Sequence, residues 1–188
     1  MKTLRKMPRH WRFALVLIPV AALALGLAVT SAVTSAMANA SPTRPFSSSG
    51  TGTEMSLSAV GCQFTLAGCA VESNGTATSS HLGTGAYVSD LTVVWAQATS
   101  NGHGGFCAPA SGPSTLTAAH GDTLTLSNSG TVCEVGHTGA NVPHTFNGTY
   151  TITGGTGRFA HASGSGTETG GDDGAGNSNY SATGSITY

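Results

Sequence analysis

The segment 144–170 constrains the fold of this chain most strongly. In its first half Phe146, Tyr150 and Ile152 share one parity, and threonine and asparagine occupy the other parity. Such alternation predicts a β-strand with one buried face. The glycine-rich run 154–157 then predicts a tight reversal, because glycine adopts positive φ readily. A second Gly/Ser/Thr-rich strand follows, so the sequence predicts a β-hairpin.

The same alternation recurs in the rest of the chain after residue 53. Short runs of alternating apolar and polar residues, such as 54–60, 85–96, 123–128 and 180–188, are separated by segments rich in turn-forming residues. Helical periodicity is absent from the sequence after residue 40. We predict an all-β fold, a single antiparallel β-barrel of about eight strands, with a sandwich as the alternative. A barrel of this size has either a packed interior or room for one small ligand.

The N-terminal 40 residues have the order of a secretory signal peptide. Five basic residues precede an uncharged apolar run at 13–29, and small residues follow as far as Ala40. We predict a signal peptide over 1–40, cleaved after Ala38 or Ala40, with an uncleaved signal anchor as the alternative. Two prolines and a Ser/Gly run predict a flexible linker over 41–52, which leaves 53–188 as the β-barrel domain.

Cleavage after residue 40 would make the mature protein acidic. It would keep two basic side chains against eight acidic ones, a net charge of −6 with neutral histidines. A chain without a basic stripe is poorly suited to nucleic acid or to an anionic lipid surface. We therefore expect an extracellular protein that contacts neither nucleic acid nor, after cleavage, the membrane.

The four cysteines lie in the part that would be exported, which indicates two disulfides. Three pairings are possible. We favour Cys62 with Cys69, which could close a short hairpin, and Cys107 with Cys133, which could tie a long loop to a strand. A zinc site would need paired C-x-x-C or H-x-x-x-H spacing, and the sequence has neither. We therefore predict no bound metal and no cofactor.

One motif resembles a known family. The stretch 150–159, YTITGGTGRF, followed by Ala162 and Gly164, is similar to the I-x-GGTG-x-F-x-x-A-x-G hairpin of allene oxide cyclase and dirigent-type barrels and of secreted actinobacterial proteins like them. Looser similarity at 81–83, 116–124 and 184–186 extends the resemblance over 75–188. The resemblance implies an eight-stranded, calycin-like antiparallel barrel. It does not place the catalytic residues of the plant enzymes on any position of this sequence.

Four residues are candidates for ligand binding. Trp95 is the only tryptophan after residue 40, and it could stack on a ligand or plug one end of the barrel. His103, His137 and His144 lie on or beside the glycine-rich loops predicted at 101–113 and 136–143, which a Cys107–Cys133 bridge would draw together. Exposed turn positions are the alternative interpretation of these histidines.

These observations support three hypotheses of function. The first is a secreted, disulfide-bonded barrel that binds a small apolar or aromatic molecule without catalysis. The second, which the resemblance implies, is an allene-oxide-cyclase-like or dirigent-like barrel that guides a cyclisation or coupling. The third is a protein-interaction module of the cell envelope. A binder needs an apolar lining with a few polar anchors, whereas a cyclase needs a charged or hydrogen-bonding group aimed at the reacting centre.

Overall fold

The computed structural model describes residues 41–56, 68–136 and 141–188. The signal peptide predicted over 1–40 lies outside these ranges, as do Cys62 and His137. Within the described residues the secondary structure is nine β-strands and two short 3₁₀ helices: β1 (Arg44–Ser56), β2 (Cys69–Ser79), β3 (Gly83–Val93), η1 (Trp95–Gln97), β4 (Thr99–Ser100), β5 (Phe106–Ala118), β6 (Thr123–Glu134), β7 (His144–Gly155), η2 (Gly157–Phe159), β8 (Ser163–Asp172) and β9 (Asn177–Thr187).

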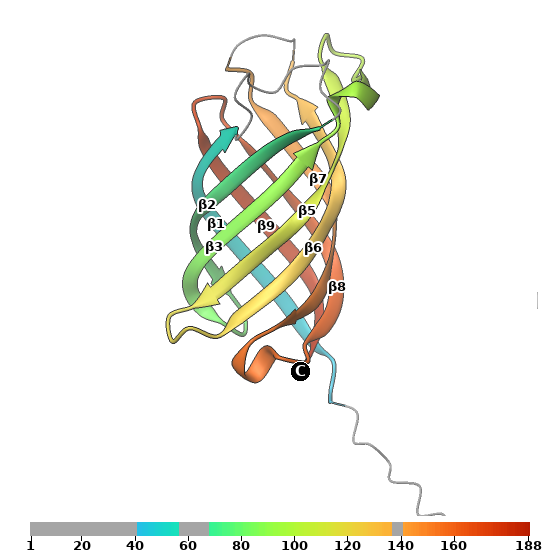
Figure 1. Cartoon of the computed structure of the whole chain (residues 1–188). Coiled ribbons are helices and arrows are strands. Elements are labelled where there is room, and N and C mark those ends of the chain that lie inside the picture. The colour runs from blue at the N-terminus through green and yellow to red at the C-terminus, as the bar shows by residue number, and fades with distance from the viewer. Residues whose placement is uncertain (1–40, 57–67, 137–140) are drawn as a thin grey trace, which may run out of the picture. The chain divides into compact units, whose positions relative to one another are not determined.

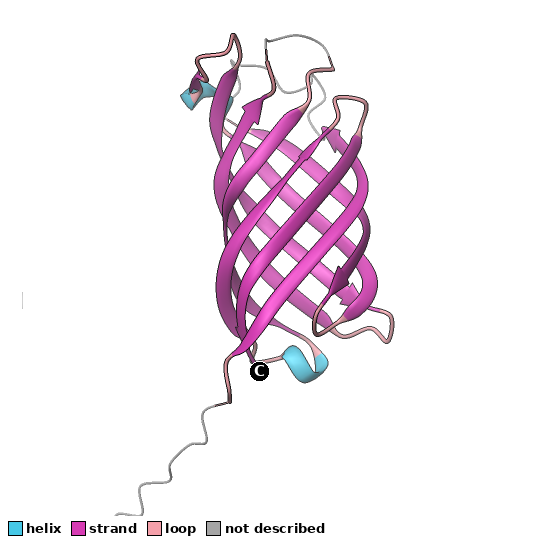
Figure 2. Ribbon diagram, turned by 180° about the vertical axis from the view of Figure 1, so that it is seen from behind, coloured by secondary structure: helices cyan, strands magenta, loops and turns pink. Residues whose placement is uncertain are grey.

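The strands form a closed antiparallel barrel (Figures 1 and 2). The sheet runs in the order β3-β2-β1-β9-β8-β7-β6-β5-β4, and an additional pairing of β3 with β5 closes it into a ring of eight strands. The two-residue strand β4 pairs only with β5, at one end of the ring. The all-β barrel of about eight strands predicted from the alternation is therefore confirmed.

The linker predicted over 41–52 is wrong from Arg44 onward. β1 begins there and pairs with β9 on one side and with β2 on the other, so the barrel begins nine residues before the predicted domain start at 53. The Ser/Gly run misled the prediction because small residues usually mark loops. Here Ser48 and Gly50 occupy inward positions of a strand, where large aromatic side chains from neighbouring strands fill the space.

The loop predicted over 101–113 is also wrong in its second half, because β5 begins at Phe106. Its two prolines occupy exposed positions. Pairing of β3 with β5 lapses between Ser89–Ser114 and Thr92–Ser111, beside Pro113, which has no N–H to donate. β2 also runs straight through Asn74-Gly75, a dipeptide that is typical of turns.

Cys107 and Cys133 form a disulfide, which confirms that predicted pairing. The two residues are direct partners on β5 and β6, and their Cα atoms are 4.0 Å apart. The bridge therefore joins two neighbouring strands instead of tying a loop to a strand. Cys69, at the start of β2, is fully buried, and its predicted partner Cys62 lies outside the described residues.

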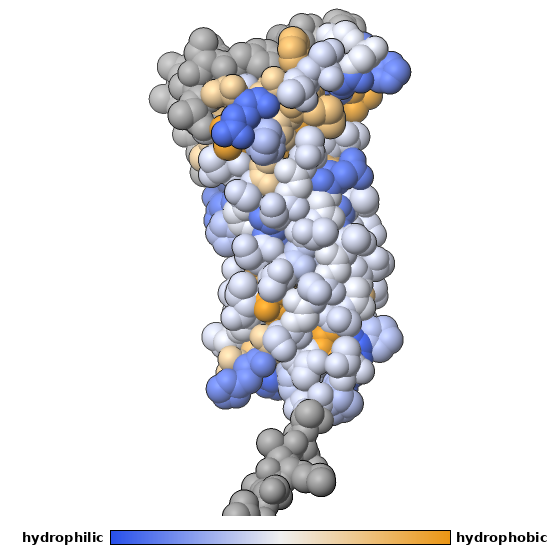
Figure 3. Space-filling view, turned by 90° about the vertical axis from the view of Figure 1, so that its right-hand side faces the viewer, coloured by the Kyte–Doolittle hydropathy of each residue, from blue (hydrophilic) through white to orange (hydrophobic). Residues whose placement is uncertain are grey.

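Two apolar clusters fill the interior. One occupies the end of the barrel that carries the β7–β8 connection, drawn at the bottom of Figure 1. It is rich in large, fully buried side chains, among them Tyr150, Leu124, Ile186 and Phe159. The second is smaller, and its buried members are Cys69, Val93, Trp95, Ala108, Ala110, Val132 and Phe146. The outer wall is mainly pale or blue in Figure 3, as expected from its outward threonines and serines.

Within the described residues no helix has the length and apolar character that crossing a membrane requires.

Inward glycines decide how the aromatic side chains lie in the barrel. A Cβ atom added at Gly148 would stand 2.7 Å from Cζ of Phe146, and one added at Gly130 would stand 2.8 Å from its Cε2. Gly130 and Gly148 are direct partners on β6 and β7. The Phe146 ring therefore lies over a patch of the barrel wall that has no side chains. It occupies less of the lumen there than it would if side chains held it away from the wall.

We expect the substitution Gly148→Ala to lower the free energy of unfolding by about 1–3 kcal/mol, because the added methyl must displace the Phe146 ring and the facing backbone. Urea denaturation followed by circular dichroism measures this. The control is Asn147→Ala, at the exposed neighbouring position, with an expected change within about 0.5 kcal/mol. Equal effects of the two substitutions would contradict the close contact.

Candidate functional site

The barrel encloses a cavity of about 240 Å³. Its lining includes members of both apolar clusters, so it lies where the two clusters meet. The apolar part of the lining comprises Phe46, Val71, Tyr87, Leu91, Val93, Trp95, Leu116, Leu126, Val132, Phe146, Tyr180 and Ala182. Because successive side chains of a strand point to opposite faces, all eight strands of the ring contribute to this lining.

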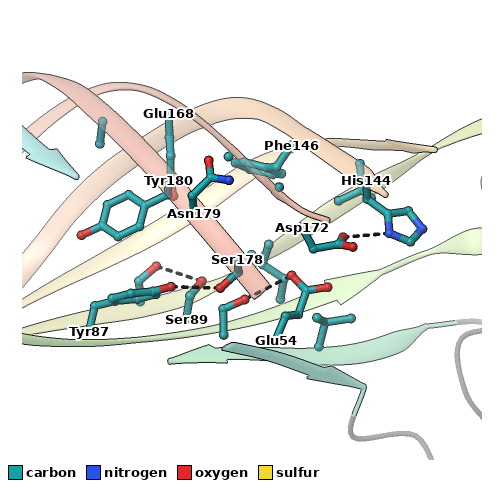
Figure 4. Close-up of a pocket in the computed structure, with 18 of the residues that line it drawn as sticks. Glu54, Tyr87, Ser89, His144, Phe146, Glu168, Asp172, Ser178, Asn179 and Tyr180 are labelled. Atoms are coloured by element: carbon teal, nitrogen blue, oxygen red, sulfur yellow. Dashed lines mark hydrogen bonds and ion pairs between the residues drawn. The ribbon is translucent and has the colours of Figure 1, made fainter. Parts of the chain in front are cut away.

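Polar side chains gather at one end of the cavity (Figure 4). His144 Nδ1 donates a hydrogen bond to Asp172 Oδ2, at 2.8 Å, and the two residues are direct partners on β7 and β8. The other carboxylate oxygen of Asp172 accepts the backbone N–H of Gly174 in the β8–β9 turn. Glu54, on β1, accepts a hydrogen bond of 3.2 Å from the Ser73 hydroxyl. Each of these polar groups is therefore held by a neighbour.

The charges at this end of the cavity affect one another. The hydrogen bond to Asp172 raises the pKa of His144 above its usual value, although burial of the imidazole opposes the shift. Burial raises the pKa of Glu54, and the nearby charge of Asp172 adds to the effect. The arrangement favours an imidazolium paired with Asp172 and a Glu54 that takes up a proton more readily than a free glutamate.

On the side of the cavity away from His144 and Asp172, the polar groups are hydroxyls. The Tyr180 hydroxyl lies 2.8 Å from the Ser48 hydroxyl, which in turn lies 2.7 Å from that of Ser79. The Tyr87 hydroxyl lies 3.1 Å from that of Ser178, and the rings of Tyr87 and Tyr180 meet edge to face at 4.9 Å. A Cβ at Gly50 would collide with both rings, so this glycine makes room for the aromatic pair. The two tyrosines thus present apolar ring surface whose hydroxyls are already satisfied.

Glu168 differs from the other carboxyl groups of the lining. Among the residues that the structure describes, it has neither a hydrogen-bond partner nor an ion-pair partner. Burial raises its pKa to about 7. Figure 4 shows its side chain on β8, apart from the paired group of His144, Asp172 and Glu54. The cavity therefore contains one carboxyl group whose hydrogen-bonding capacity is unused by the described protein.

The predicted ligand-binding residues divide into three groups. Trp95 and His144 both line the cavity, and their rings lie 6.0 Å apart. His103 is exposed in the segment before β5 and is not among the described residues that line the cavity. His137 lies outside the described residues. Whether any of these residues contacts a ligand stays a prediction.

Glu168 was not among the candidate site residues predicted from the sequence. The available signal was parity: Gly164, Gly166, Glu168 and Gly170 share the inward face of β8. Asp172 ends the same face, so Glu168 is the charged residue that lies between its glycines, and it is conspicuous once that face is known to point inward. Glu54 was not predicted as a site residue because its strand was expected to begin at residue 54. The structure places it on the same strand as Phe46 and Ser48, which also line the cavity.

Among the described ranges, no three His, Cys, Asp or Glu side chains are grouped so that they could hold a metal ion.

We predict that Glu168→Gln raises the free energy of unfolding by roughly 2 kcal/mol at pH 8 and leaves it nearly unchanged at pH 4. Burial raises the pKa of Glu168 to about 7 in the folded protein. The contribution of Glu168 to the free energy of unfolding is therefore fully present below pH 4.5 and is lost as the pH rises through 7. Denaturant titrations at the two pH values measure this. An equal effect at both would show that Glu168 is not buried as an unpaired acid.

We predict that Asp172→Asn lowers the pKa of His144, because the charged acceptor that holds its proton is lost. In the native protein this pair stabilises the fold below about pH 6.5, and the stabilisation disappears as the pH rises through the raised pKa of His144. NMR titration of the imidazole carbons measures the shift, with the exposed His161 as internal reference. An unchanged His144 titration would contradict the pairing.

No family model matches the chain, and the searches of curated proteins and of solved structures also returned no match. We therefore infer function from the chemistry of the cavity.

Proposed function

We propose that the protein is an exported β-barrel that binds one small, largely aromatic or apolar molecule in its cavity. The single observation that supports this most is the cavity itself, which has apolar walls from the barrel's strands and a few polar groups gathered at defined positions. Apolar walls with a small number of polar anchors are typical of small-molecule sites.

The size of the cavity limits the ligand. An apolar cavity of about 150 Å³ accommodates benzene, so 240 Å³ suits a molecule of about two fused rings with a short side chain. The aromatic surfaces of Trp95, Phe146 and Tyr180 line this space. Flat aromatic ligands gain most from such walls, because ring faces and edges pack favourably against one another.

Export is part of the proposal. The Cys107–Cys133 disulfide suits an oxidising compartment, and the sequence of residues 1–40 has the order of a signal peptide. The intact mass of the protein recovered from culture supernatant tests this. We expect the mass of a chain that starts after Ala38 or Ala40, and a mass that retains residues 1–40 would contradict it.

We also propose a relationship with the allene oxide cyclase and dirigent-type barrels. The eight-stranded antiparallel ring supports it, as does the structural role of the shared motif. Gly154 and Gly157 have positive φ, at 136° and 57°, where the chain leaves β7. Phe159 and Ala162 are buried in the cluster at that end of the barrel. The motif is therefore scaffold, which is consistent with a shared fold and does not bear on a shared reaction.

A second candidate function is guidance of a cyclisation or coupling within the same cavity. The observation that favours it is Glu168, whose pKa of about 7 suits a group that donates or accepts a proton near neutral pH. A reactive substrate held between the aromatic walls would be confined to few conformations. Under this alternative Glu168→Gln would abolish turnover while leaving binding of an unreactive neutral ligand intact.

Native mass spectrometry of the exported protein gives the first test of the binding proposal. We expect a non-covalent adduct whose mass corresponds to one small organic molecule. A bare chain under gentle ionisation, together with no binding of the neutral probe 3-propylindole, would contradict the proposal.

We predict that Ser89→Leu weakens binding of 3-propylindole at least about tenfold, because Ser89 lines the cavity and the larger side chain would occupy ligand space. The matched control is Val88→Leu, a change at the neighbouring position, whose side chain is exposed. Saturation-transfer NMR with calorimetry measures both affinities. Equal affinities for the two variants would place the binding site outside this cavity.

A further inference from the structure

We propose that the ligand is an aromatic amine whose protonated nitrogen pairs with the carboxylate of Glu168. This inference rests on the proposed binding function and specifies the chemistry of the ligand. It follows from the surroundings of Glu168, from the occupation of the other interior carboxyl groups, and from the charges that line the cavity.

The residues next to Glu168 in the sheet have small side chains or none, so none of them can hydrogen-bond its carboxyl group. Its inward neighbours along β8 are Gly166 and Gly170, and its direct partners on the adjacent strands are Gly148 of β7 and Ala182 of β9. The Tyr150 hydroxyl lies over Gly166 and the Phe146 ring lies over Gly148, and within the described residues neither makes a hydrogen bond to the carboxyl group. A ligand atom can therefore approach Glu168 from the cavity that it lines.

The other interior carboxyl groups already have partners. Glu54 accepts from Ser73, and Asp172 accepts from His144 and from the backbone of the next turn. Glu134, which is buried close to the cavity's end, accepts the backbone N–H of Phe106 at 2.9 Å. Glu168 alone among these four has no such partner within the described ranges. Buried carboxylates are stable when they are paired, and a donor group on a ligand would supply the partner that Glu168 lacks.

The charged residues that line the cavity favour a donor with a positive charge. The lining contains three carboxyl groups, one histidine and neither lysine nor arginine among the described residues. The two arginines of the described chain lie at the opposite end of the barrel, where Arg44 stacks over Tyr188 and Arg158 donates to the carbonyl of His81. Since His144 is already paired with Asp172, the unbalanced charge is negative. A carboxylate ligand would be repelled and an ammonium attracted.

Aromatic rings complete the environment for an ammonium group. Tyr180 lines the cavity. Burial raises the pKa of its hydroxyl to about 12, and the nearby charge of Glu168 adds to the rise. Ring faces attract ammonium groups. The Tyr180 hydroxyl is engaged by Ser48, so its ring and not its hydroxyl is the available surface. An aromatic amine can use the carboxylate for its charge and the walls for its rings.

Binding of such an amine should be linked to protons. Burial raises the pKa of free Glu168 to about 7, so an ammonium that requires the carboxylate form binds more tightly as the pH rises from 5 to 8. The other titratable groups of this interior are Glu54 of β1, Tyr87 of β3, Glu134 of β6, His144 and Tyr150 of β7, Asp172 of β8 and Tyr180 of β9. The substitution Glu168→Gln should remove the rise in amine affinity that ionisation of Glu168 causes between pH 5 and 8.

Three ligands of matched shape test the inference: tryptamine, 3-propylindole and indole-3-propionate, which are cationic, neutral and anionic at pH 7.5. We expect calorimetry with the disulfide-bonded protein to show tryptamine binding at least about tenfold more tightly than 3-propylindole, and indole-3-propionate binding most weakly. Glu168→Gln should remove the advantage of tryptamine and leave 3-propylindole unchanged. The control Glu72→Gln removes a carboxylate on β2 that is not among the lining residues, and should change neither affinity more than about twofold.

The outcomes separate this inference from the proposed function. Equal binding of the three ligands, tightest binding of indole-3-propionate, or a tryptamine advantage that survives Glu168→Gln would overturn the inference and leave the binding function standing. Failure of all three to bind, together with a bare chain in native mass spectrometry, would overturn both. Thermal denaturation of Glu168→Gln at pH 8 checks that the variant is folded, and a raised melting temperature is the expected result.

Discussion

The close contact between aromatic rings and inward glycines is the constraint on which the rest of this barrel depends. Phe146 lies over Gly130 and Gly148, the Tyr150 hydroxyl lies against Gly166 and Gly184, and Tyr87 and Tyr180 share the space at Gly50. In an eight-stranded ring the interior is just wide enough for side chains to fill. Glycines let the aromatic rings lie close to the wall, so part of the lumen is left empty. The cavity is a consequence of this arrangement.

The same glycines determine the electrostatics of the cavity. The inward face of β8 carries Glu168 between glycines, and its partners across the strands are Gly148 and Ala182. The side chains at these positions carry no polar group, and the nearby Tyr150 hydroxyl makes no hydrogen bond to the carboxyl group. Asp172, on the same strand, is instead fixed by His144 and by the turn that follows. One wall thus holds a paired acid at the end of the strand and an unpaired acid in its middle.

Much of the fold could be predicted from sequence, because strict alternation such as that of Phe146, Tyr150 and Ile152 is typical of a half-buried strand and fits no helix. The Cys107–Cys133 bridge was also predictable as a pairing. β1 was not, since a Ser/Gly run with Pro45 is typical of linkers unless the aromatic rings opposite it are known. Of the site, Trp95 and His144 were named in advance. The parity of Glu168 among the glycines of β8 was available in the sequence, but its lack of a partner depends on the register with Gly148 of β7 and Ala182 of β9, which no local pattern encodes.

The binding proposal depends on the cavity that Trp95, Phe146 and Glu168 line. A crystal structure of the ligand-free protein under xenon pressure tests it most directly, since xenon occupies dry apolar cavities. We expect xenon density against the Phe146 and Tyr87 rings, with the Glu168 carboxyl facing the same space. An interior closed by Phe146 and Tyr180 side chains, with no xenon between them, would contradict it.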